Sequence, residues 1–263
     1  PKFVDTIRTD TNYAVFEYGA REDGYDGVGA RYPKLDRIKL YRNDGVFLSS
    51  VEFEYDYSLK VGFPGTASGK GVLTLKKIKF FDSASKEFKA PIEFSYTTPN
   101  PGFSTVNDYY KYDSWGYYAS TGTSTSHRTS PLYNDVSASA WSLNKVKWST
   151  GGSTEWVYEG NYYGFINDRD TAPYDSFKGG GVRVPEVKNC PNAGNAVGCL
   201  ITKYLYSASL EPLDFEGDTG TTGVAVSIPG TYTLLQENPV VDQAGVVSYV
   251  GYSHVTEINA YNE

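Results

Sequence analysis

A strand–turn–strand pattern that ends in tyrosine recurs along this 263-residue chain and limits the fold more than any other feature. In each copy, a strand with alternating apolar residues leads to a polar or glycine-rich turn. A second strand follows, with aromatic residues two positions apart. Such period-two alternation is typical of half-buried strands. Full copies lie at residues 35–55, 73–96, 143–158 and 181–206, and a half copy lies at residues 14–18.

The aromatic residues of each second strand share one face. Val51, Phe53 and Tyr55 point to one side of their strand, whereas Glu52 and Glu54 point to the other. A single hairpin is only marginally stable in water, so several must lie side by side and share one aromatic stripe. The sequence therefore predicts an all-β fold in which stacked antiparallel hairpins form an extended, curved sheet.

The composition agrees with this fold class. The chain holds 24 Tyr and 13 Phe, residues that favour a pleated surface, and no window shows a helical period. Residues 43–45 (Asn-Asp-Gly) and the Gly151-Gly152 pair supply the positive φ that tight hairpins require. We expect one hairpin-repeat region over residues 1–263, with loop insertions at about 97–142 and 161–180.

The two cysteines lie close together in the sequence. Cys190 and Cys199 bracket a segment rich in Pro, Asn and Gly, and strand-like residues flank both ends. This arrangement places them opposite each other at the mouth of a hairpin loop, within disulfide reach. A disulfide indicates an oxidising compartment. A zinc site would need two more ligands, and only His127 and His254 exist.

Charge and hydropathy exclude several classes of partner. The net charge is −7, and no Lys or Arg follows Lys203. Nucleic acid is not an expected partner, because phosphate binding needs clustered basic residues. No segment is apolar and long enough to span a bilayer as a helix. The chain begins with Pro, contains no Met and shows no signal peptide, so we interpret it as a mature or excised piece of a longer polypeptide.

Four motifs in order carry a family resemblance. They are DSWGYY at 113–118, WSTGGSTEWVYE at 148–159, GGGVRV at 179–184 and VGYSHVTE at 250–257. Residues 143–158 resemble one RHS/YD repeat, and the ordered set resembles large secreted Bacteroidetes proteins with RHS-like repeats, over about residues 34–261. The resemblance implies a long spiralling sheet of hairpins, which in many such proteins closes into a shell around a C-terminal toxin.

No catalytic motif stands out. His127 lies in a Ser/Thr-rich tract and His254 in a strand-like run, and neither is paired in sequence with a nucleophile. The chain has no nucleophile elbow, P-loop or zinc-protease helix, and no carboxylate pair stands out among its 31 acidic residues. The sequence therefore predicts a protein that is not an enzyme.

Calcium is the one cofactor for which the sequence offers candidate loops. Clustered loop carboxylates suit hard cations, although such clusters are more often plain turn acids. No loop matches an EF-hand, and we expect no bound cofactor. The acidic segments are residues 22–27, 167–170 and 214–218.

Aromatic residues in the insertions offer a second class of function. Exposed rings could stack on sugars or contact a partner protein, and the alternative is that they cap the ends of the sheet. These candidate contact residues are Trp115, Tyr117, Tyr118, Tyr162 and Tyr163.

We expect a non-catalytic scaffold segment of a secreted or cell-surface protein, one that encloses or presents a C-terminal effector. Its expected partners are further repeats or domains of the same polypeptide, or a secretion or assembly partner. The alternative is a cell-surface adhesin or carbohydrate-binding module that uses the inserted aromatic residues.

Overall fold

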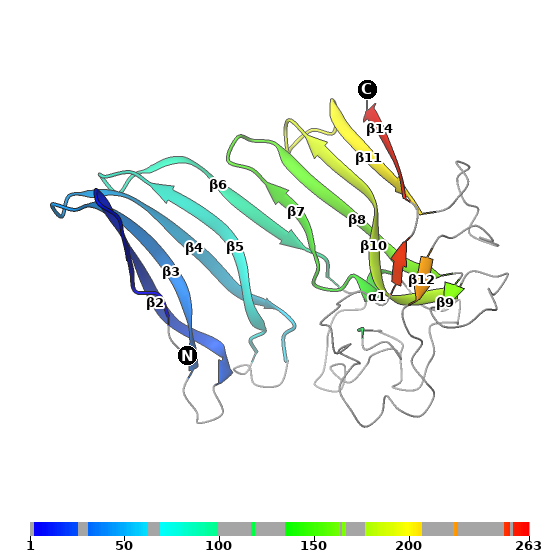
Figure 1. The fold of residues 1–263 in the computed structure, drawn as a ribbon, viewed down its shortest axis with the longest axis horizontal. Coiled ribbons are helices and arrows are strands. Elements are labelled where there is room, and N and C mark those ends of the chain that lie inside the picture. Colours follow the sequence, from blue (N-terminus) through cyan, green and yellow to red (C-terminus); the bar gives the residue numbers. More distant parts are fainter. Residues whose placement is uncertain are drawn as a thin grey trace. The chain divides into compact units, whose positions relative to one another are not determined.

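The computed structural model describes residues 3–25, 31–62, 69–98, 117–118, 135–163, 165–166, 177–206, 223–225, 250–252 and 255–262. These residues are all-β apart from one helical turn, α1 (Asp135–Ala138). Figure 1 shows the main sheet, whose strand order is β1-β2-β3-β4-β5-β6-β7-β8-β10-β11-β14. The predicted fold of antiparallel hairpins in one open sheet is confirmed. Among the described residues, no helix has the length and apolar character needed to cross a membrane.

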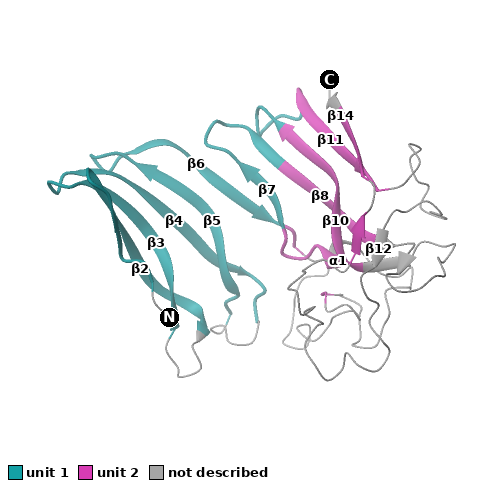
Figure 2. Ribbon diagram, in the orientation of Figure 1, with its two compact units in different colours: residues 1–96, 143–154, 190–196 teal, residues 97–142, 155–189, 197–263 magenta. Residues whose placement is uncertain are grey.

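The chain divides into two compact units, coloured separately in Figure 2. Unit 1 comprises residues 1–96, 143–154 and 190–196, and unit 2 comprises residues 97–142, 155–189 and 197–263. Most of the predicted insertion at 97–142, and most of the one at 161–180, lies outside the described residues.

Unit 1 consists of consecutive hairpins. Its strands are β1 (Thr6–Arg8), β2 (Asn12–Tyr25), β3 (Arg31–Arg42), β4 (Phe47–Leu59), β5 (Val72–Phe81), β6 (Glu87–Tyr96), β7 (Leu143–Lys147) and the first residues of β8 (Ser153–Tyr163). The predicted glycine turns are present. Gly45 has a φ of 90° and Gly151 a φ of 93°, and each donates its N–H to a carbonyl of its own turn.

Four hairpins share one register. Each has an aliphatic residue before its turn, the anchor (Val4, Leu35, Leu75 or Val184), and a terminal tyrosine after it (Tyr18, Tyr55, Tyr96 or Tyr206). The residue two positions after the anchor always lies opposite the residue three positions before the terminal tyrosine. These pairs are Thr6 with Val15, Arg37 with Glu52, Lys77 with Glu93, and Glu186 with Lys203.

Each terminal tyrosine closes its hairpin with the same hydrogen bond. The hydroxyl donates to the carbonyl of the anchor of that hairpin, at 2.8 Å in every case. Burial raises the pKa of Tyr55 and Tyr96, so both hydroxyls stay protonated and can donate. In these four hairpins the terminal tyrosine is therefore a clamp between the two strands.

A register shift precedes the terminal tyrosine where neighbouring hairpins pair. It falls between Glu17 and Tyr18, between Glu54 and Tyr55, and between Ser95 and Tyr96. An extra residue on the facing strand increases the local twist. The shift places each of these tyrosines opposite an aliphatic residue of the next hairpin: Tyr18 opposite Leu35, Tyr55 opposite Leu75, and Tyr96 opposite Leu143.

The prediction of a half copy at residues 14–18 is wrong, because these residues belong to a full hairpin. β1 pairs with β2, with Ile7 opposite Ala14, and Tyr18 donates to the Val4 carbonyl. The first strand escaped notice because it is only 3 residues long, is exposed and leads into a turn without glycine.

The aromatic stripe of unit 1 is continuous from strand to strand. Phe53 lies opposite Ile78, Ile78 lies opposite Ile92, and Phe94 lies opposite Val146. Val146 is only 3% exposed, whereas the other four side chains are half-buried. The predicted lateral alignment is thus confirmed in unit 1, but these hairpins form a single layer that leaves the stripe partly accessible.

The far end of β2 braces unit 1. Asp23, whose side chain is 4% exposed, accepts hydrogen bonds from Arg21 and from the Leu73 N–H of β5. The Tyr57 hydroxyl of β4 accepts a hydrogen bond from the Glu22 N–H. β2 therefore contacts strands that are not its neighbours in the sheet.

Unit 2 contains the remaining strands. They are most of β8, β9 (Phe165–Ile166), β10 (Phe177–Cys190), β11 (Cys199–Leu205), β12 (Gly223–Ala225), β13 (Val250–Tyr252) and β14 (Thr256–Asn262). β9, β12 and β13 form a separate three-stranded sheet, in which β12 pairs parallel to β9. β14 pairs antiparallel to β11 and ends the main sheet.

Candidate functional site

A buried arginine lies in β10 of unit 2. The Arg183 side chain is 9% exposed, and its Nε donates to the Glu159 carboxylate at 2.5 Å. Three tyrosine rings surround the guanidinium. Its central carbon, Cζ, lies 4.4 Å from the ring centroid of Tyr206, 5.2 Å from that of Tyr252 and 5.3 Å from that of Tyr162. We name these five residues and Asn161 the arginine cluster. Cation–π contacts of this kind gain strength when they are desolvated.

Tyr252 ties the cluster together. Its hydroxyl donates to the Asn161 side-chain oxygen at 3.1 Å and accepts a hydrogen bond from the Tyr162 N–H at 3.1 Å. Asn161 is 6% exposed, and its amide donates to the Gly180 carbonyl at 2.7 Å. These bonds connect β13 to β8 and β10, although Tyr252 and Asn161 are 91 residues apart in the chain.

Electrostatics fixes the protonation states of the cluster. Burial lowers the pKa of Arg183, but Tyr252 and Glu159 raise it more, so the guanidinium stays charged. Burial raises the pKa of Tyr252 and Tyr206. At neutral pH both tyrosines are therefore neutral, and neither is a nucleophile. The arrangement is suited to cross-bracing three strands rather than to acid–base chemistry.

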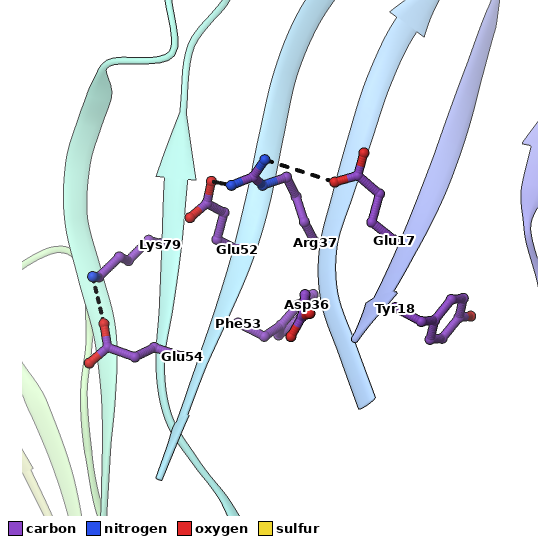
Figure 3. Close-up of a pocket in the computed structure, with 8 residues that line it drawn as sticks. All are labelled: Glu17, Tyr18, Asp36, Arg37, Glu52, Phe53, Glu54 and Lys79. Atoms are coloured by element: carbon purple, nitrogen blue, oxygen red, sulfur yellow. Dashed lines mark ion pairs between the residues drawn. The ribbon is translucent and has the colours of Figure 1, made fainter. Parts of the chain in front are cut away.

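A second charged feature crosses the face of unit 1 opposite the aromatic stripe. Residues that face one another on neighbouring strands alternate there between acidic and basic. One row consists of Glu17, Arg37, Glu52 and Lys79, and another of Glu54, Lys77, Glu93 and Lys147. We name these rows the charge ladder. Figure 3 shows Arg37 between Glu17 and Glu52, and Lys79 paired with Glu54 at 2.5 Å.

The charge ladder borders a shallow depression of about 470 Å³. Its lining is Glu17, Tyr18, Asp36, Arg37, Glu52, Phe53, Glu54 and Lys79. The charged side chains of the ladder that line the depression form ion pairs with one another, so little unpaired charge remains to attract a ligand. Opposite charges facing each other across strands stabilise pairing and disfavour shifted registers. The ladder therefore specifies how the hairpins align.

The disulfide prediction is confirmed. Cys190 and Cys199 are disulfide-bonded, and the β10–β11 register runs up to the pair, with Asn189 opposite Leu200. The chain has no other cysteine. Such a bond suits the oxidising environment in which extracellular proteins occur.

The described tyrosines among the predicted contact residues pack against neighbouring residues of the same chain. The Tyr117 ring lies against Gly181, Tyr118 contacts Trp141 with ring centroids 4.8 Å apart, and Tyr162 lies beside Arg183. All three predicted tyrosines are half-buried. Trp115 and the side chain of Tyr163 lie outside the described residues.

The described part of the chain contains no group of three or more His, Cys, Asp or Glu side chains placed to hold a metal ion. Of the predicted calcium loops, residues 22–25 are described, and Asp23 there accepts hydrogen bonds from Arg21 and from the Leu73 N–H. The segments 167–170 and 214–218 lie outside the described residues, as do His127 and His254.

Comparison with family models, with curated proteins and with solved structures gave no match. The residues themselves therefore carry the functional argument.

Sequence reasoning missed the arginine cluster, although three quoted motifs contain its members. Glu159 ends WSTGGSTEWVYE, Arg183 lies in GGGVRV and Tyr252 lies in VGYSHVTE. A single Arg between Val182 and Val184 was the available signal, because a lone charge in an apolar strand needs a buried partner. No local pattern connects it to Tyr252.

Proposed function

We propose that this chain is a non-catalytic scaffold segment of a secreted RHS/YD-repeat-like protein, which encloses or presents an effector that follows it in the same polypeptide. One observation carries the proposal: hairpins of different length and sequence end in the same tyrosine-to-anchor hydrogen bond. A device repeated in four hairpins serves the stability of an array rather than one site.

The surroundings of the hairpins support the same role. The disulfide, the arginine cluster and the brace at Asp23 each join separate strands. The aromatic stripe of unit 1 remains half-buried and offers a surface for further polypeptide. The adhesin alternative draws little support from Tyr117, Tyr118 and Tyr162, because each ring packs against a neighbouring residue and is half-buried.

Limited proteolysis of the natural full-length polypeptide tests the proposal. We expect the effector region to resist protease in the intact protein and to become sensitive when residues 31–96 are deleted. Mass spectrometry identifies the cleavage sites. A matched variant with the conservative change Tyr41→Phe should retain the protection. Equal digestion rates with and without the hairpins would refute the enclosing role, and specific binding on a glycan array would favour the adhesin.

A further inference from the structure

β1 is the first strand of a hairpin, and among the described strands it pairs only with β2. Its register matches that of the next hairpin, because Thr6 lies opposite Val15 and the Tyr18 hydroxyl donates to the Val4 carbonyl. Val4 is therefore an anchor equivalent to Leu35. The outer edge of such a strand offers unpaired N–H and C=O groups to a further strand.

Three junctions between hairpins of unit 1 show which residues cover this edge elsewhere. At each junction, the terminal tyrosine of the preceding hairpin lies opposite an aliphatic residue. The Phe two positions before that tyrosine lies opposite a second aliphatic residue, three positions after the first. Val4 and Ile7 have this spacing in β1. The pairs are Tyr18 with Leu35 and Phe16 with Ile38, Tyr55 with Leu75 and Phe53 with Ile78, and Tyr96 with Leu143 and Phe94 with Val146.

Val4 and Ile7 are exposed, whereas their counterparts are covered. Val4 is 51% and Ile7 53% exposed. Of the six counterparts at the three junctions, Val146 is 3% exposed and the other five are half-buried. Each counterpart has a neighbouring strand on both sides, but β1 has one on a single side. A strand that brings Phe and Tyr to the open side therefore supplies the missing cover.

Arg8 adds a charge requirement to this edge. At the three junctions, a Lys lies four positions after the first aliphatic residue and faces the residue three positions before the preceding terminal tyrosine. Arg8 holds this position in β1 and is exposed. A strand that extends the charge ladder therefore brings an acidic residue opposite Arg8. The pairs at the junctions are Lys39 with Val15, Lys79 with Glu52, and Lys147 with Glu93.

We propose that the outer edge of β1 binds, antiparallel, the terminal strand of a further hairpin with the pattern acidic-Phe-x-Tyr. The tyrosine lies opposite Val4, the Phe opposite Ile7 and the acidic residue opposite Arg8. The described strands with this pattern, β4 and β6, already pair on both edges, so polypeptide outside the described residues supplies the strand. This inference deepens the scaffold proposal and rests on it, since it names the partner of one sheet edge.

A labelled peptide tests the edge directly. The probe is a fluorescent, amidated heptapeptide with the sequence of residues 49–55, which carries Glu52, Phe53 and Tyr55 in the required spacing. It is titrated with the whole chain and followed by fluorescence anisotropy, and we expect saturable binding. Phe53→Ser in the peptide should weaken binding several-fold, because Ile7 then lacks its apolar partner.

A charge exchange locates the binding site. Glu52→Lys in the peptide should weaken binding to the natural chain roughly 2- to 10-fold, and Arg8→Glu in the chain should restore the affinity for this altered peptide. Lys86→Glu is the matched control. It makes a similar charge change in the exposed turn between β5 and β6, and it should leave the affinity for both peptides unchanged.

Three results overturn the proposal. The first is the absence of saturable binding to a chain whose circular dichroism shows it to be folded. The second is a Glu52→Lys effect that Arg8→Glu does not reverse. The third is association of two copies through β1 that excludes the peptide, measured by sedimentation. Retained protease protection of the effector region in the full-length protein would then leave the scaffold role standing.

Discussion

Replacing Tyr96 by Phe removes one clamp while leaving the ring in place. The Tyr96 hydroxyl donates to the Leu75 carbonyl at 2.8 Å, and the side chain is half-buried. A net hydrogen bond contributes about 0.5–1.5 kcal/mol, and a half-buried carbonyl that loses its donor adds part of its desolvation cost. We therefore expect Tyr96→Phe to lower the free energy of unfolding by about 1–2 kcal/mol.

Urea unfolding followed by far-UV circular dichroism measures this change. The dependence of the free energy of unfolding on urea concentration, m, should be the same for the variant and the natural chain, which shows that both unfold in the same reaction. Tyr41→Phe is the matched control. Tyr41 also lies in unit 1 and stacks on Tyr13 at 5.1 Å, but its hydroxyl makes no hydrogen bond with the described residues. If the two substitutions destabilise the protein equally, the clamp contributes nothing beyond ring packing and the reasoning fails.

Three further predictions concern other joints of the fold. Burial raises the pKa of Asp23, but hydrogen bonds from Arg21 and Leu73 lower it more, so the pKa of Asp23 is depressed in the folded protein. The ionised carboxylate therefore stabilises the fold fully above the unfolded pKa of about 3.9, and this contribution is lost as the pH falls through the lower folded pKa. Asp23→Asn should accordingly reduce the loss of stability at acid pH when the free energy of unfolding is measured against pH. Gly71→Ala should lower the midpoint of thermal unfolding strongly, because a Cβ there would lie 1.7 Å from a backbone oxygen, whereas Gly251→Ala meets no atom within 4 Å. Reducing the disulfide should lower the free energy of unfolding by roughly 2–3 kcal/mol, and a double Cys→Ser variant should show the same loss without reductant.

Local signals predicted the hairpins and the disulfide. Alternation, turn residues and terminal tyrosines lie within about 25 residues of one another in a hairpin, so one strand constrains its neighbour directly. The two cysteines lie at the facing ends of β10 and β11, and the hairpin that joins these strands brings them together. These features required no knowledge of residues far away in the chain.

The bulges and the arginine cluster could not be predicted in the same way. A register shift beside Tyr55 comes from the pairing of two strands and leaves no mark in the alternation of either. The contact of Arg183 with Tyr252 joins distant segments, and either residue alone is consistent with an ordinary strand. Tertiary contacts of this kind depend on how the intervening chain folds.

The clamp also explains why the repeats are unevenly spaced. Terminal tyrosine and anchor are 14, 20, 21 or 22 residues apart, yet the hydrogen bond is the same in all four hairpins. It joins the open ends of the two strands, so the turn between them can change in length without altering the register there. Loop-closure entropy grows only slowly with length, and the eight-residue loop between Cys190 and Cys199 is therefore tolerated as readily as the short turn at Gly45. Because the open ends also face the next hairpin, a fixed clamp lets hairpins of different length add to one sheet.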